Sequence, residues 1–211
     1  MNLHPEQVAP TILTVGDPER VAMVSQYFDR IEHIIQKREF VTHTGYIGAK
    51  RLTVISTGIG TDNIDIVFNE LDALFNIDLQ RKMVQPVFTP LTFIRIGTSG
   101  CLSKDIPIDA FLVSALAVGL DNLLQYYQLP QSKLSQSIQE KIQSSFQTAS
   151  TLPLSPYVVE GSTALLQALG KDMYHGITLT ASGFYAPQGR QLRAAVRQPD
   201  LIDIFLSLIH I

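Results

Sequence analysis

Three short runs rich in β-branched residues each stop at a glycine-containing loop in the first half of the chain. They are TILTV (residues 11–15), RLTVIST (residues 51–57) and LTFIRIG (residues 91–97). Runs of this length that end at glycine are typical of buried strands. The first two lead into helical patterns at residues 21–28 and 62–75. This alternation predicts an α/β fold with a mixed or mostly parallel sheet and helices on both faces.

Capping residues and apolar spacing mark the expected helices. Asp17 is predicted to cap the first helix, with Pro18 at its first position. The second helix places five apolar side chains on one face: Ile64, Val67, Phe68, Leu71 and Phe75. Further helices are expected at residues 131–146 and 162–170, the latter between Ser162 as cap and Gly170 as stop.

The remaining segments complete a single expected domain over residues 1–211. Residues 109–118, 157–161 and 176–181 have the composition of strands. Residues 41–51 indicate a hairpin with its turn at YIGAK, and residues 80–90 indicate a long loop or a small insertion. We find no internal repeat.

Composition limits the function classes. The 211 residues are 45% hydrophobic and 17% charged, as in a globular protein with a sizeable core. A net charge of −3 without a cluster of basic residues argues against nucleic-acid binding, and the apolar runs are too short to span a membrane. The N-terminus lacks a signal-peptide pattern, and the five scattered histidines and single cysteine give no zinc-site spacing. We therefore expect a cytoplasmic protein without a bound metal.

Two of the loops that follow strands have the chemistry of an anion site, at the sheet edge where α/β proteins bind ligands. In VGDPER (residues 15–20), Gly16 exposes backbone N–H groups and Arg20 lies on the first helical turn. The alternative is a capped helix with a surface arginine. In FIRIGTSG (residues 93–100), Arg95 interrupts an apolar strand, which requires a ligand anion or a structural ion pair. Thr98 adds a hydroxyl.

Two other segments are ambiguous on local grounds. STGIGTDN (residues 56–63) approaches the dinucleotide fingerprint, but Asn63 stands where its third glycine belongs, so close packing of a strand on a helix is favoured. Arg38, just before the expected hairpin, has the local pattern of a solvated side chain.

The loop SGFYAPQGR (residues 182–190) carries a carboxamide, Gln188, and a guanidinium, Arg190, behind the aromatic Phe184. Taken alone, these are solvated surface residues. Together with VGDPER, REF, STGIG and RIGTSG, the loop occurs in the order and approximate spacing of the nucleoside phosphorylase superfamily, over nearly the whole chain. Within that superfamily the sequence resembles the uridine phosphorylases.

The resemblance implies a three-layer phosphorylase/hydrolase-like α/β fold whose mixed central sheet is partly barrelled and flanked by helices. It implies a hexamer built from dimers, and uridine and inorganic phosphate as substrates without a further cofactor. Five residues match the family's phosphate-binding positions: Gly16, Arg20, Arg38, Arg95 and Thr98. In the family, the arginine at the position of Arg38 reaches into the neighbouring subunit's site.

The base-binding positions match Phe184, Gln188 and Arg190, and the expected catalytic groups are Arg95, Gln188 and Arg190. A carboxamide can donate to one uracil carbonyl and accept from the ring N–H, while a guanidinium donates to the other carbonyl. Such donors stabilise the negative charge that develops on the departing base. FYAPQGR contains no Asp or Glu to protonate a purine, which favours a pyrimidine.

Two family features have no match. No two glutamates are separated by one residue, so the Glu-Met-Glu segment that holds the ribose is absent, and His4 does not match a family histidine near the ribose. Residues after about Asp203 depart from the family, and SLIHI (residues 207–211) is of doubtful origin. We therefore expect a domain that is incomplete at its C-terminus and inactive alone. The alternatives are a purine phosphorylase, a nucleosidase that uses water, and a non-catalytic binding module.

Overall fold

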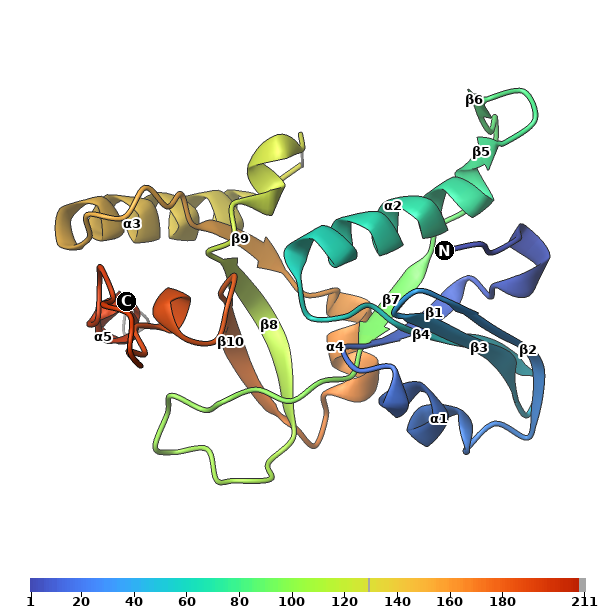
Figure 1. The fold of residues 1–211 in the computed structure, drawn as a ribbon, viewed down its shortest axis with the longest axis horizontal. Coiled ribbons are helices and arrows are strands. Elements are labelled where there is room, and N and C mark those ends of the chain that lie inside the picture. Colours follow the sequence, from blue (N-terminus) through green and yellow to red (C-terminus); the bar gives the residue numbers. More distant parts are fainter. Residues whose placement is uncertain (129, 209–211) are drawn as a thin grey trace. The chain divides into compact units, whose positions relative to one another are not determined.

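The computed structural model describes residues 1–128 and 130–208, and the chain divides into two compact units (Figure 1). The first unit spans residues 1–99 and the second residues 100–211. Each has its own sheet and its own hydrophobic core, so each is described by itself. That residues 1–211 act as one domain stays a prediction.

The first unit is built on a five-stranded mixed sheet in the order β2-β3-β4-β1-β7. Strand β1 is parallel to both β4 and β7, whereas β2, β3 and β4 form an antiparallel meander. The elements of this unit are η1 (Pro5–Gln7), β1 (Thr11–Val15), α1 (Glu19–Ser25), β2 (Arg30–Lys37), β3 (Phe40–Ile47), β4 (Lys50–Ser56), α2 (Thr61–Asn76), β5 (Ile77–Asp78), β6 (Met83–Val84) and β7 (Thr92–Arg95).

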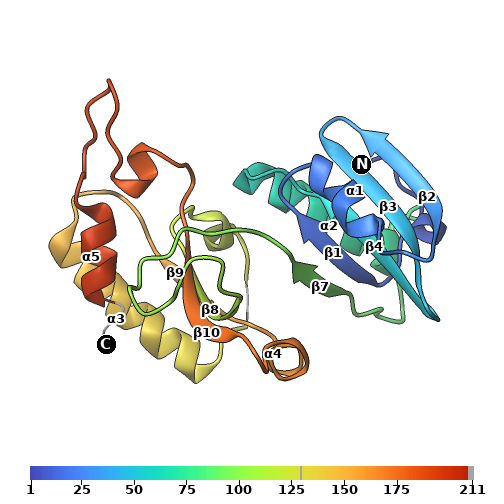
Figure 2. The same cartoon turned by 90° about the horizontal axis from the view of Figure 1, so that it is seen from below.

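Two helices cover opposite faces of this sheet (Figures 1 and 2). Ile12 of β1 packs in the same cluster as Val67 and Leu71 of α2. Its neighbour in sequence, Leu13, packs with Val21 of α1. Successive residues of a strand point to opposite faces, so one buried strand serves both clusters. The first unit is therefore a three-layer α/β/α arrangement, as expected.

The first helix begins one residue later than expected, because Pro18 and not Asp17 is its N-cap residue. The helix is assigned from Glu19, and the Asp17 carboxylate accepts the Glu19 backbone N–H at 2.9 Å. Pro18 therefore lies between the Asp17 side chain and its donor.

Three strands were not predicted from the sequence: β2, β5 and β6. Strand β2 is an edge strand with a register shift between Ile31 and His33, which breaks its alternation of apolar residues. The segment predicted as a long loop or insertion contains β6, which pairs with β5 in a two-stranded hairpin. Asn76 anchors this segment, because its carbonyl accepts from Gln85 N–H and its side-chain oxygen from Thr89 N–H, each at 2.8 Å.

The second unit is built on a three-stranded sheet in the order β10-β8-β9. Strand β8 is parallel to β10 and antiparallel to β9. Its elements are β8 (Leu112–Gly119), η2 (Leu123–Tyr126), α3 (Lys133–Ala149), β9 (Tyr157–Glu160), α4 (Thr163–Leu169), β10 (Tyr174–Thr180), η3 (Ala186–Gln188) and α5 (Leu201–Leu208). The expected strands and helices of this half are thus confirmed.

Helices α3 and α5 supply most of the second core. The Phe146 ring of α3 stacks on the Phe205 ring of α5 with centroids 5.3 Å apart, and both pack with Val118 and Val158 of the sheet. The predicted cap of α4 is also present, because the Ser162 hydroxyl accepts from Leu165 N–H. The sequence analysis predicted that SLIHI (residues 207–211) is of doubtful origin. Residues 209–211 of this segment lie outside the described residues.

The expected α/β class with flanking helices is confirmed, but the expected partial barrel is wrong. Closing a sheet requires its two edge strands to pair. In the first unit the edges β2 and β7 do not pair with each other, and the sheet of the second unit has only three strands. Each sheet is therefore open. Across residues 1–128 and 130–208, no helix is long and apolar enough to cross a membrane.

Candidate active site

The carboxyl ends of three parallel strands meet at one edge of the first unit's sheet. Val15 at the end of β1 is in register with Ser56 of β4, and Thr14 with Arg95 of β7. The chain leaves this edge as three adjacent loops that begin at Gly16, Thr57 and Ile96. This is the location expected for a ligand site in an open α/β sheet.

Arg95 is the last residue of β7, the outermost of these three strands. Its Nη1 is 3.5 Å from the Thr57 hydroxyl oxygen, a long contact, and a Cβ added to Gly16 would lie 3.4 Å from its Nη2. Partial burial lowers the pKa of the Arg95 guanidinium, and the positive charge of Arg20 lowers it further. No carboxylate of residues 1–128 or 130–208 forms an ion pair with Arg95. The alternative of a structural ion pair is therefore absent from the described part.

Gly16 and Arg20 complete the same edge. Gly16 is buried, and a side chain there would also meet Ile59 Cγ2 at 3.2 Å. The half-buried Arg20 makes no side-chain hydrogen bond or ion pair to any described residue. Two guanidinium groups thus act on each other without an intervening carboxylate, and a bound anion would relieve their repulsion.

The other two predicted phosphate residues are Thr98 and Arg38. Thr98 is exposed in the loop after β7. Arg38 occupies the turn between β2 and β3, with a φ of 55°. That turn adjoins the end of β4, because the Ser56 hydroxyl donates to the Glu39 carbonyl at 2.9 Å. Three strand spacings, roughly 14 Å, separate β3 from β7.

The loop STGIG turns the chain from β4 into α2. Gly58 has a φ of 65°, and a Cβ there would lie 2.5 Å from the Asn63 side chain. Gly58 is therefore required by the turn itself, which agrees with the packing interpretation of this segment. Sequence reasoning flagged the loop but missed Thr57 as a site residue. The sequence did contain a signal for it: Thr57 is a hydroxyl residue directly after a predicted strand, at the sheet edge where ligands bind.

The predicted base loop follows β10 in the second unit. Its backbone closes on itself, with Gln188 N–H and Arg190 N–H both donating to the Tyr185 carbonyl at 2.8 and 2.9 Å. The Gln188 side-chain N–H donates to the Gly183 carbonyl at 3.1 Å. This bond fixes the carboxamide and leaves its oxygen and its second N–H for a ligand.

The other two base residues are open to solvent. Phe184 is 57% exposed, and Arg190 is exposed without a side-chain partner among the described residues. The structure thus brings Phe184, Gln188 and Arg190 together on one loop. The phosphate residues belong to the other unit.

A glycine holds the end of this loop in place. Gly189 has a φ of 71°, and a Cβ there would lie 2.4 Å from the Pro199 carbonyl oxygen. We expect Gly189→Ala to lower the free energy of unfolding by about 2–3 kcal/mol, from backbone strain plus this clash.

Gly48 provides a matched control, since its φ is 56° but nothing lies within 4 Å of an added Cβ. Gly48→Ala should cost only about 1 kcal/mol. Urea unfolding of both variants measures the difference, and equal losses would contradict the close approach at Gly189.

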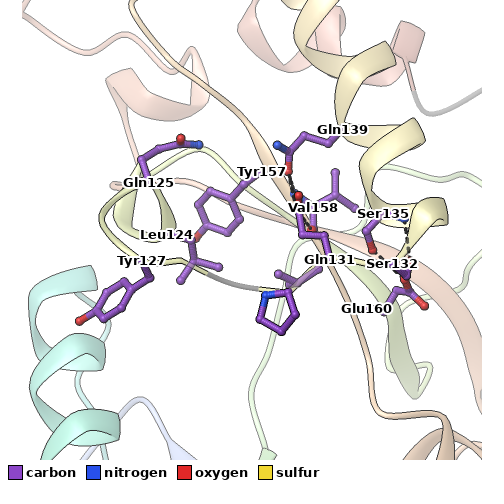
Figure 3. Close-up of a pocket in the computed structure, with 12 residues that line it drawn as sticks. Leu124, Gln125, Tyr127, Gln131, Ser132, Ser135, Gln139, Tyr157, Val158 and Glu160 are labelled. Carbon is purple, nitrogen blue, oxygen red and sulfur yellow. Dashed lines mark hydrogen bonds between the residues drawn. The ribbon is translucent and has the colours of Figure 1, made fainter.

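A separate pocket of about 510 Å3 lies in the second unit (Figure 3). Its polar groups bond to one another: Ser132 and Ser135 both donate to the Glu160 carboxylate. Hydrogen bonds from these two hydroxyls lower the pKa of Glu160, and the bond from Ser132 has the larger effect. None of the predicted site residues lines this pocket. In the described residues no cluster of three or more His, Cys, Asp or Glu side chains could hold a metal ion.

The sequence model of the phosphorylase superfamily matches residues 10–204. The chain therefore belongs to the phosphorylase superfamily. It is 29% identical to a uridine phosphorylase of Thermococcus kodakarensis over 88% of this chain and 56% of that protein. It is 28% identical to the Haemophilus influenzae uridine phosphorylase over 90% of this chain and 64% of that protein. The chain thus spans less than two thirds of the length of these relatives.

A solved structure agrees with these matches. The Trypanosoma brucei nucleoside phosphorylase, described as showing uridine phosphorylase activity, superposes with a TM-score of 0.77 at 30% identity. The match covers 94% of this chain and 71% of that one. Purine nucleoside phosphorylases also match, at lower identity.

Proposed function

We propose that this protein takes part in the phosphorolysis of uridine to uracil and ribose 1-phosphate. The observation that carries the proposal is the Arg95 guanidinium, which has no carboxylate partner among the described residues and lies beside Gly16, near the charge of Arg20. A phosphate dianion is the ligand that this arrangement suits, because it offers several oxygens to two cations and to backbone N–H groups.

In this reaction a phosphate oxygen forms a bond to C1′ of the ribose as the bond from C1′ to N1 of uracil breaks. The bonding electrons leave with uracil, and the sugar passes through a state with positive character. Arg20 and Arg95 hold the nucleophile, whose remaining negative charge stabilises the sugar. Arg38 lies in the turn before β3, three strands away from β7. We propose that it serves the site of a neighbouring subunit.

The base loop supplies the second half of the chemistry. Gln188, fixed through Gly183, can accept from the uracil N3–H and donate to one carbonyl, while Arg190 donates to the other. Phe184 offers an exposed ring on which the base can stack. Donors at the uracil oxygens stabilise the negative charge that the departing base acquires.

A purine substrate is the second candidate, since purine nucleoside phosphorylases are among the relatives. The loop around Gln188 offers no carboxylic acid to protonate a purine, so uridine is the better fit. We propose further that the protein is a cytoplasmic, dimer-based hexamer that needs no cofactor beyond phosphate as co-substrate.

The test is uracil release from uridine, followed with and without inorganic phosphate in the protein as its gene encodes it. We expect release that saturates with phosphate and nearly stops without it. Equal release in both conditions would indicate a nucleosidase. Binding of both compounds without any release would indicate a binding module.

A further inference from the structure

Thr57 connects the three loops of the phosphate edge. Its side chain is fully buried, directly after β4. The Thr57 backbone N–H donates to the Val15 carbonyl at 2.8 Å, which joins its loop to the end of β1. Its hydroxyl lies 2.9 Å from the Gly58 carbonyl and 3.3 Å from the Val15 carbonyl.

The same hydroxyl oxygen also accepts from Arg95 Nη1, over a long contact of 3.5 Å. A hydroxyl has one proton, so Thr57 can donate to only one of the two carbonyls at a time, and its lone pairs remain to accept. Arg95 Nη1 donates to this oxygen, and no other side chain of residues 1–128 or 130–208 accepts from the guanidinium. The buried Thr57 hydroxyl can therefore hold the Arg95 guanidinium in one orientation.

We propose that Thr57 is a positioning residue for phosphate, acting through Arg95. The inference rests on the proposed function of this edge and deepens it. A guanidinium binds an anion through N–H groups in one plane, so holding Nη1 sets which of the other N–H groups face the ligand. The buried hydroxyl fixes this plane before phosphate arrives, which lowers the ordering cost of binding.

The test compares Thr57→Val, which keeps the shape but removes the hydroxyl, with Thr57→Ser, which keeps the hydroxyl. We expect Thr57→Val to raise the phosphate KM by about five- to tenfold, because one hydrogen bond to a charged group is lost. The KM for uridine should stay at the parent value, and thermal unfolding should show whether each variant is folded. Thr57→Ser should restore most of the phosphate affinity.

Two results would overturn the proposal. One is a folded Thr57→Val variant with the phosphate KM of the parent. The other is a Thr57→Ser variant as weak as Thr57→Val, which would assign the effect to the methyl group. A parent protein without any phosphate dependence would overturn the proposed function of the edge, and this inference with it.

Discussion

Replacing Arg95 with alanine is expected to lower kcat/KM for phosphate by roughly 100- to 1,000-fold, the range seen when one charge-stabilising donor is removed. Arg95 is exposed at the end of β7, its guanidinium is repelled by Arg20, and no carboxylate of the described residues pairs with it. Its removal should not destabilise the fold, because no ion pair is broken. Phosphate saturation curves at fixed uridine measure the effect.

Arg81 provides the matched control for this variant. It is an exposed arginine of the same unit whose contact with Asp78 is long, at 3.8 Å. Arg81→Ala should leave the phosphate curve unchanged, since exposed pairs of this kind contribute little. A folded Arg95→Ala variant with the phosphate dependence of the parent would remove Arg95 from the site.

Replacing Gln188 with leucine is expected to lower kcat/KM for uridine by roughly 100-fold, because the polar edge of uracil then loses its partner. The carboxamide is held by the Gly183 carbonyl at 3.1 Å, so its remaining groups are oriented before the base binds. The preference for uridine over inosine should largely disappear. Initial rates with the two nucleosides at saturating phosphate give both quantities.

Gln191 lies on the same segment, exposed and without a side-chain hydrogen bond to any described residue. Gln191→Leu should keep both the rate and the preference of the parent. A parent protein that cleaves inosine as fast as uridine would contradict the pyrimidine assignment before any variant is made.

The strands and helices could be predicted where a buried face requires apolar residues at regular positions in the sequence. Strand β1 is apolar on both sides because it packs against α1 and α2, and its run of β-branched residues shows this directly. Edge strand β2 could not be recognised, because most of its residues are exposed and its register shifts. Strands β5 and β6, with two residues each, are too short to show any period.

Single residues of the candidate site could be proposed from the sequence, but their contacts could not. Gly16 was singled out because it follows a strand, and Arg95 because it interrupts an apolar one. That Arg95 meets Thr57, 38 residues earlier in the sequence, depends on the strand order β4-β1-β7. Local sequence does not encode such pairing.

The identity of the sugar product tests the central claim most directly. Uridine is incubated with the protein and isotopically labelled inorganic phosphate, and the sugar is separated from uracil. Attack by phosphate at C1′ predicts ribose 1-phosphate that carries the label, in equal amount to the uracil released. Free, unlabelled ribose in that amount would show that water is the nucleophile and would contradict the assignment of Arg20 and Arg95 to phosphate.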